Sequence, residues 1–120
     1  MLAPLLILAL HLQIQTTEVP EIVRGTGLFQ SCKGAIRWMD APEAAKPRAD
    51  DENFDNCTAY IGGFIEGRAI VGCEPPDATF GTLARVYVAY MEKNPKLLDN
   101  FRFVGLQLAI TDSYPCHLKK

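Results

Sequence analysis

The sequence has few of the side chains on which enzyme active sites most often depend. Only two histidines occur among its 120 residues, His11 in an apolar N-terminal segment and His117 near the C-terminus. A cysteine–histidine nucleophilic pair needs a free thiol that faces a histidine across a cleft, whereas His117 is only the chain neighbour of Cys116. We therefore expect no catalytic residue and interpret the chain as a binding protein, not an enzyme.

Signatures of metal and cofactor binding are also scarce. No two cysteines have the close C-x-x-C spacing of zinc or thioredoxin-like sites. The acidic run Asp50, Asp51 and Glu52 lacks EF-hand spacing, which favours a solvated loop over a cation site. Three glycines fall within a helical pattern that follows no strand, so they form no phosphate-binding loop: Gly62, Gly63 and Gly67. The sequence thus predicts no metal and no cofactor.

Neither a basic face nor a membrane-spanning run is evident. The formal net charge is −2, which removes the usual electrostatic case for nucleic acid. The nearly apolar run Leu2–Leu12 is shorter than the roughly 20 residues that a spanning helix needs. It suits the core of a secretory signal peptide. We expect residues 1–18 to be that signal and residues 19–120 to form one mature domain without stable membrane insertion.

The leader departs from the usual signal pattern in two ways. No Lys or Arg precedes the apolar run, and no clear small-x-small cleavage site follows it. The alternative is an N-terminal core helix, which His11 and Gln13 disfavour because they interrupt a helical stripe.

The four cysteines support export. They are separated by 24, 15 and 42 residues, and an even number with wide gaps behind an apolar leader favours structural disulfides in an oxidising compartment. Four buried thiols in a cytosolic protein are the alternative.

The apolar pattern predicts four helices. The first begins at Thr26 as N-cap, and a polar loop from Asp40 to Asp55 separates it from a second helix that begins near Asp55. Gly62 and Gly63 in the second helix would permit close approach of a neighbouring helix. The apolar faces of these two helices comprise Leu28, Phe29, Cys32 and Ile36, then Cys57, Tyr60, Ile61, Phe64 and Ile65.

The third and fourth helices have clearer ends. Thr79 is the expected N-cap of the third, which Asn94 and Pro95 terminate. The fourth spans residues 100–114 and is followed by Pro115. The expected buried faces are Leu83, Val86, Tyr87, Tyr90 and Met91, then Phe103, Leu106, Ile110 and Tyr114.

This helix order suggests how the cysteines pair. Because a short connection joins the third and fourth helices, we expect them to lie antiparallel, which returns the end of the fourth to the neighbourhood of Cys73. Of the three possible connectivities, this layout favours Cys73–Cys116 and leaves Cys32–Cys57 to join the first two helices. The predicted fold is all-α, a compact domain of four helices or slightly more, stapled by two disulfides.

An ordered set of short motifs resembles a known family. The chain reads CTAYIGGF from Cys57, Cys73-Glu74-Pro75 before Thr79, YMEKNP over residues 90–95, and Tyr114-Pro115-Cys116 at the end. Together these motifs resemble the Rap/Tai-type immunity proteins of bacterial type VI secretion systems, over residues 26–116. The long segment from Asp40 to Asn56 and the irregular leader depart from that pattern or cannot be compared with it.

The resemblance implies a periplasmic, all-α protein that binds a cognate effector, typically a peptidoglycan amidase, and blocks its active site. Such binding would protect the producing cell from its own toxin. A small periplasmic stress chaperone, or another binding module not linked to type VI secretion, is the competing interpretation. The sequence leaves open whether the protein forms a homodimer.

Two segments are candidates for contact with the partner. The turn from Glu66 to Cys73, with Glu66 and Arg68, is preorganised by a disulfide and would be the element inserted into the partner's cleft. The acidic loop, with Asp50, Asp51 and Glu52, would steer association with a basic partner surface.

Overall fold

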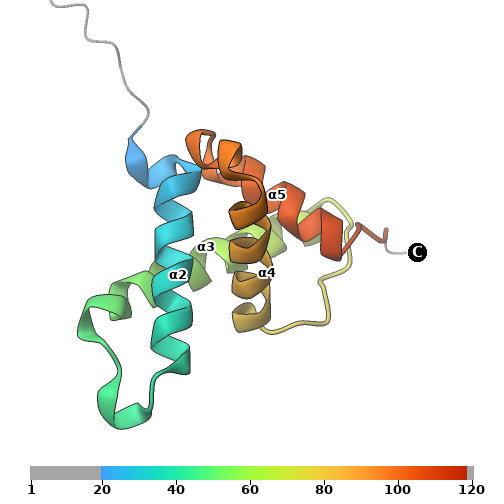
Figure 1. Cartoon of the computed structure of the whole chain (residues 1–120). Helices are drawn as coiled ribbons and strands as arrows, with labels where there is room; N and C mark the ends of the chain where they lie inside the picture. Colours follow the sequence, from blue (N-terminus) through green and yellow to red (C-terminus); the bar gives the residue numbers. More distant parts are fainter. Residues whose placement is uncertain (1–19, 119–120) are drawn as a thin grey trace, which may run out of the picture.

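The computed structural model describes residues 20–118 as an all-α domain. Four α-helices are present in this part of the chain: α2 (Gly25–Asp40), α3 (Asp51–Ile70), α4 (Phe80–Lys93) and α5 (Arg102–Ser113). Short 3-10 turns η1 to η4 occupy Glu21–Val23, Glu43–Ala45, Arg48–Asp50 and Pro95–Asp99. The predicted all-α fold with two disulfides is confirmed (Figure 1). The predicted signal peptide lies outside the described residues.

The ends of α4 follow the sequence signals. Thr79 is its N-cap, and the Thr79 hydroxyl oxygen accepts a hydrogen bond from the backbone N–H of Thr82 at 3.1 Å. The helix ends at Lys93 because Asn94 precedes Pro95, and a residue before proline is driven out of the helical conformation.

The predicted N-cap of the first helix is wrong. Helix α2 begins at Gly25, and the N-cap residue is Arg24, which makes no side-chain capping bond. Thr26 lies inside the first turn, where its hydroxyl donates to the carbonyl oxygen of Leu98 at 2.9 Å. Gly25 itself lies against the η4 backbone, because a Cβ at this position would be only 2.5 Å from the Leu97 carbonyl oxygen. Contact with η4 therefore fixes the start of α2.

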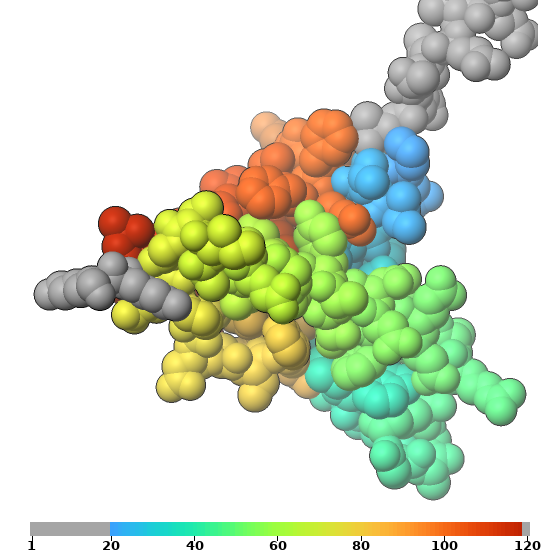
Figure 2. Space-filling model, turned by 180° about the vertical axis from the view of Figure 1, so that it is seen from behind, coloured from blue at the N-terminus to red at the C-terminus, as the bar shows by residue number. Residues whose placement is uncertain are grey.

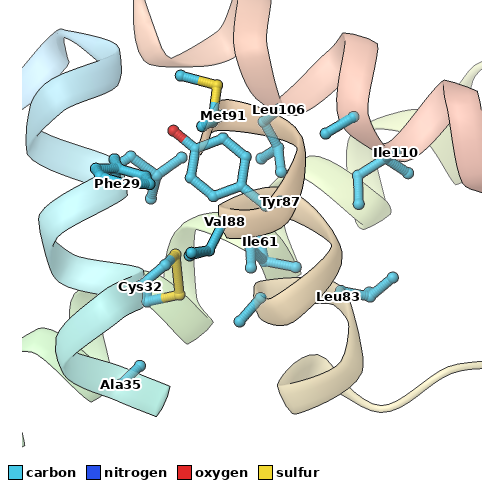
Figure 3. Packing of buried hydrophobic residues seen from close by; sticks show 14 of the residues in the cluster. Phe29, Cys32, Ala35, Ile61, Leu83, Tyr87, Val88, Met91, Leu106 and Ile110 are labelled. Carbon is cyan, nitrogen blue, oxygen red and sulfur yellow. A yellow bond between two sulfur atoms is a disulfide. The ribbon is translucent and has the colours of Figure 1, made fainter. Parts of the chain in front are cut away.

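One core joins all four α-helices. Tyr87 of α4 lies at its centre, fully buried, and its hydroxyl donates to the carbonyl oxygen of Gly25 at 3.3 Å (Figure 3). Burial raises the pKa of the Tyr87 phenol far above its ordinary value, so the ring stays neutral. Fully buried side chains around it include Cys32, Cys57, Ile61, Met91, Leu106 and Ile110.

Helix α5 differs in two respects from its prediction. It crosses the end of α4 at a wide angle and does not run back along it (Figure 1). Phe103, expected in the core, has 54% of its surface exposed, whereas Leu106 and Ile110 are buried as predicted. Phe103 points outward because the buried stripe of α5 is narrow and is formed by Gly105, Leu106, Ala109 and Ile110.

Both predicted disulfides are confirmed. Cys32–Cys57 joins α2 to α3 inside the core, with a Cα–Cα distance of 4.9 Å. Cys73–Cys116 joins the α3–α4 connection to the segment that follows α5, with a Cα–Cα distance of 5.0 Å. No helix in residues 20–118 is both long enough and apolar enough to cross a membrane.

Candidate functional site

A groove between α3 and α5 is a large, mainly apolar hollow on the described surface. Figure 2 shows the face on which these two helices lie side by side. The groove has a volume of about 750 Å³. The Cys73–Cys116 bridge and Val71 line it near the end of α3, and Tyr60 lines it further toward the start of that helix. The other lining residues, here called the groove residues, are Ala59, Gly63, Phe64, Gly67 and Arg68 of α3 and Phe103, Gln107 and Thr111 of α5.

Two glycines on α3 leave part of the groove surface without side chains. A Cβ placed on Gly63 or on Gly67, one helical turn apart, would have no atom within 4 Å. Gly62, on a neighbouring face of the same helix, lies instead against the Phe80 ring, at 3.7 Å from the corresponding Cβ position. Each glycine in a helix interior costs about 1 kcal/mol relative to alanine. Packing within the described chain therefore requires neither Gly63 nor Gly67. Of the two glycines predicted to permit close approach of a helix, Gly62 contacts Phe80 at the start of α4, whereas nothing approaches Gly63.

Two aromatic rings in contact with each other line the groove. Phe64 is buried and Phe103 is exposed, and their ring centroids lie 5.7 Å apart in an edge-to-face arrangement. This contact joins α3 to α5 across the groove. Near the Tyr60 end, the Arg102 guanidinium stacks on the Tyr60 ring, 4.0 Å from its centroid.

Arg68 is a buried cation of this groove without an acidic partner. Only 8% of its surface is exposed, and Nη2 donates to the carbonyl oxygen of Tyr114 at 2.9 Å. Nη1 is buried and has no hydrogen-bond partner among residues 20–118, and no described carboxylate lies within 4 Å of the guanidinium. A buried donor left unpaired costs about 1–3 kcal/mol, and more when it is charged. Nη1 of Arg68 is thus a buried donor beside the groove whose partner is not supplied by residues 20–118.

The segment predicted as a bridged turn is mostly helix. Helix α3 continues to Ile70, so Glu66 and Arg68 are helical residues and the turn itself comprises only Val71 and Gly72 before Cys73. Gly72 has φ of 97°, which an L side chain rarely adopts. Ile70 and Val71 are 85% and 73% exposed at this corner. The corner is therefore a rigid, apolar, solvent-facing element.

The acidic run is not a free loop. Helix α3 begins at Asp51, not near Asp55, and Asp50 is buried, with only 5% of its surface exposed. Arg37 donates two hydrogen bonds to the Asp50 carboxylate, at 3.2 and 3.0 Å, and Asn53 donates a third at 3.0 Å. These donors, Arg37 foremost, hold the pKa of Asp50 below its usual range. The expectation that Asp50 is an exposed steering charge is wrong, because the side chain is used to fasten α2 to α3.

The rest of this segment is held against α2. Trp38 packs on Phe54 with ring centroids 4.3 Å apart, and its Nε1 donates to Asp51 at 2.7 Å. Lys46 lies over the Trp38 ring and donates to the Trp38 carbonyl oxygen at 2.8 Å. Asp51 and Glu52 are exposed. The structure thus places the charges expected to steer association on the first turn of a well-anchored helix.

The groove and the sequence-predicted residues overlap only in part. Arg68 lies in the groove and Glu66 on the exposed surface of the same helix, whereas Asp51 and Glu52 lie near its other end. The contribution of α5 was missed because the predicted fourth helix placed Phe103 in the core. The sequence signal that could have indicated the groove is the pair Gly63 and Gly67, which lie four residues apart in the C-terminal half of the predicted second helix.

The described residues offer a surface for binding, with no group of three or more His, Cys, Asp or Glu residues arranged to hold a metal ion. Comparison with curated proteins and with solved structures gave no significant match. A sequence profile of the Rap1a immunity proteins matches residues 24–116, which span all four α-helices and both disulfides. The chain therefore belongs to the Rap1a immunity protein family.

Proposed function

We propose that this protein is exported to the periplasm, where it binds a cognate effector of a type VI secretion system and inhibits it. The effector is a peptidoglycan amidase, and its inhibition protects the producing cell. The observation that carries this proposal is the family match over residues 24–116. Two disulfides and the apolar leader support an oxidising compartment outside the cytosol.

The rigid corner at Ile70 and Val71 supports inhibition by insertion. An element that enters an enzyme cleft loses little entropy on binding if it is already ordered. The corner is held by helix α3 on one side and by the Cys73–Cys116 bridge on the other, and its two apolar side chains face solvent. Glu66 lies one turn earlier and is exposed, so it would meet the partner beside the inserted corner.

The exposed acids at the start of α3 support electrostatic steering. Asp51 and Glu52 are separated from the corner by most of the length of α3. Charges outside the tightly packed contact mainly alter the association rate and its salt dependence. We therefore assign Glu66 and Arg68 to the contact and Asp51 and Glu52 to steering, whereas Asp50 stabilises the fold.

Surface plasmon resonance with the amidase-like product of a neighbouring gene tests these roles. Substitution of Glu66 by alanine should speed dissociation with little effect on association. The double substitution Asp51→Asn and Glu52→Gln should slow association and flatten its dependence on salt, while dissociation stays unchanged. Asp77→Asn, an exposed acid in the α3–α4 connection, serves as a control of equal charge change per site. If neither variant differs from the control, the contact lies elsewhere.

Periplasmic protection tests the function itself. Cells that export the effector should lyse, and cells that also export this protein should grow. The same protein without residues 1–18 should fail to protect, because it stays in the cytosol and its disulfides do not form. The chaperone interpretation would be supported in place of immunity by two observations together. The cells would grow although the protein does not bind the effector, and the protein would bind many unfolded proteins at acid pH.

A further inference from the structure

We propose that the groove between α3 and α5 is a docking site for a segment of the partner protein that presents a carboxylate beside a large apolar side chain, with Arg68 as the carboxylate anchor. The identity of the partner as the effector rests on the proposed function. The chemistry of the segment follows from the groove alone.

Arg68 specifies the carboxylate. Its guanidinium is buried in the groove wall, uses Nη2 on the Tyr114 carbonyl oxygen, and leaves Nη1 without a partner among the described residues. A guanidinium pairs more favourably with a carboxylate than with any neutral acceptor, because both N–H···O bonds are charge-assisted. Nη1 has no exposed surface in the free protein. The carboxylate therefore reaches it through a small rotation of the arginine side chain, whose several torsions allow that movement.

Gly63 and Gly67 specify the apolar neighbour. Their faces are open to the groove, and nothing within the described chain occupies the space that side chains would fill. Glycine is commonly used where a ligand must approach the backbone closely. Phe103 of α5 lies across the groove from them and contacts Phe64 of α3, and these two rings make the remaining space apolar.

The openness of the groove favours a protein segment over a lipid chain. A fatty acid is best held in an enclosed cavity, whereas this groove opens onto a surface that already exposes Phe103, Val71 and Leu118. Exposed apolar side chains next to a groove are typical of protein–protein contacts. The disulfide at one end fixes the width of the groove, so the site is largely preformed.

The first experiment uses small probes and does not involve the effector. The disulfide-bonded protein is titrated with N-acetyl-Leu-Phe as the free acid, and separately as the carboxamide, while amide resonances are followed by NMR. We expect shifts centred on Gly63, Gly67 and Phe103, and binding of the acid about tenfold tighter than binding of the amide. In Arg68→Met, the acid and the amide should bind within about twofold of each other.

A second variant, which fills the groove, keeps the test decisive even if Arg68→Met fails to fold. Gly67→Leu places a side chain in open space, so the protein should fold and lose binding of both probes. Gly62→Ala, on the neighbouring face against Phe80, is the matched control and should bind as the wild type does. Equal binding of acid and amide by the wild type would overturn the anchor role of Arg68. Binding of decanoate with the dipeptide acid left unbound would overturn the choice of a protein segment.

The second experiment separates this inference from the proposed function. The effector should bind Gly62→Ala with wild-type affinity and Gly67→Leu at least about tenfold more weakly. If the effector binds both variants equally, the groove inference is wrong and immunity stands. If the probes bind the groove but the effector does not bind the wild type, the groove stands and the proposed function is wrong. Concentration-dependent self-association that Gly67→Leu abolishes would assign the groove to a second copy, and would overturn the inference.

Discussion

Removal of the Cys32–Cys57 bridge should destabilise the protein more than removal of Cys73–Cys116. The bridges connect cysteines 25 and 43 residues apart, so loop entropy alone assigns about 3.5 and about 4 kcal/mol to them. Packing reverses the order of the two stability losses, because the core bridge is buried. Cys32 and Cys57 have no exposed surface, and replacement of both by alanine leaves a cavity that costs about 2 kcal/mol more. In the outer bridge only Cys73 is buried and Cys116 is exposed, so its removal adds less of this cost.

The two double alanine variants can be compared by urea denaturation followed by far-UV circular dichroism. We expect a loss of about 5–6 kcal/mol in the free energy of unfolding for the core pair and of about 4 kcal/mol or less for the outer pair. A core variant that is unfolded in buffer agrees with this order if the outer variant is folded. An outer pair that costs as much as the core pair, or more, would show that burial of the sulfur atoms does not determine the difference.

Three further predictions concern single side chains. Thr79→Ala should lower the free energy of unfolding by about 1 kcal/mol in thermal or chemical denaturation, because α4 loses its N-cap bond. Gly67→Ala should raise it by up to about 1 kcal/mol, whereas Gly25→Ala should lower it because the new Cβ meets a backbone carbonyl at 2.5 Å. The Arg37 contact keeps the pKa of Asp50 low, so this stabilisation is present above the unfolded value of about 3.9 and is lost as the pH falls through the folded value. The stability advantage of wild type over Asp50→Asn should therefore shrink below about pH 4; an advantage that is constant down to pH 2 would contradict the assignment.

The fold could be predicted where a local pattern coincides with tertiary packing. The cap at Thr79 and the break at Asn94 are local signals, and both are confirmed. The disulfide pairing is also confirmed, although its stated reason was incomplete. Helix α5 leaves α4 at a wide angle, and Cys116 reaches Cys73 because the end of α5 lies near the end of α3 (Figure 1). The pairing requires only that the end of α5 lies near the end of α3. Several different arrangements of the helices meet that requirement.

The predictions were wrong where a side chain contacts an element that is distant in the sequence, or where helix packing determines its direction. Threonine is a residue type favoured at N-caps, but the Thr26 hydroxyl donates a hydrogen bond to the carbonyl oxygen of Leu98, 72 residues away. Asp50 belongs to an acidic run that is typical of a solvated loop, yet it is buried and forms an ion pair with the exposed Arg37. The outward position of Phe103 follows from the crossing angle of α5, which periodicity does not define. The groove was missed for that last reason, because it exists only when α5 lies beside α3.

Inhibition of the effector is the most direct test of the central claim. The mature, disulfide-bonded protein should be titrated into the purified amidase-like effector while cleavage of peptidoglycan is measured at neutral pH. We expect cleavage to fall linearly with added protein and to be abolished at about one equivalent per effector molecule. Reduction of the disulfides should restore cleavage. Cleavage that continues unchanged in the presence of a large excess of the folded protein would contradict the proposal that this chain is an immunity protein for that effector.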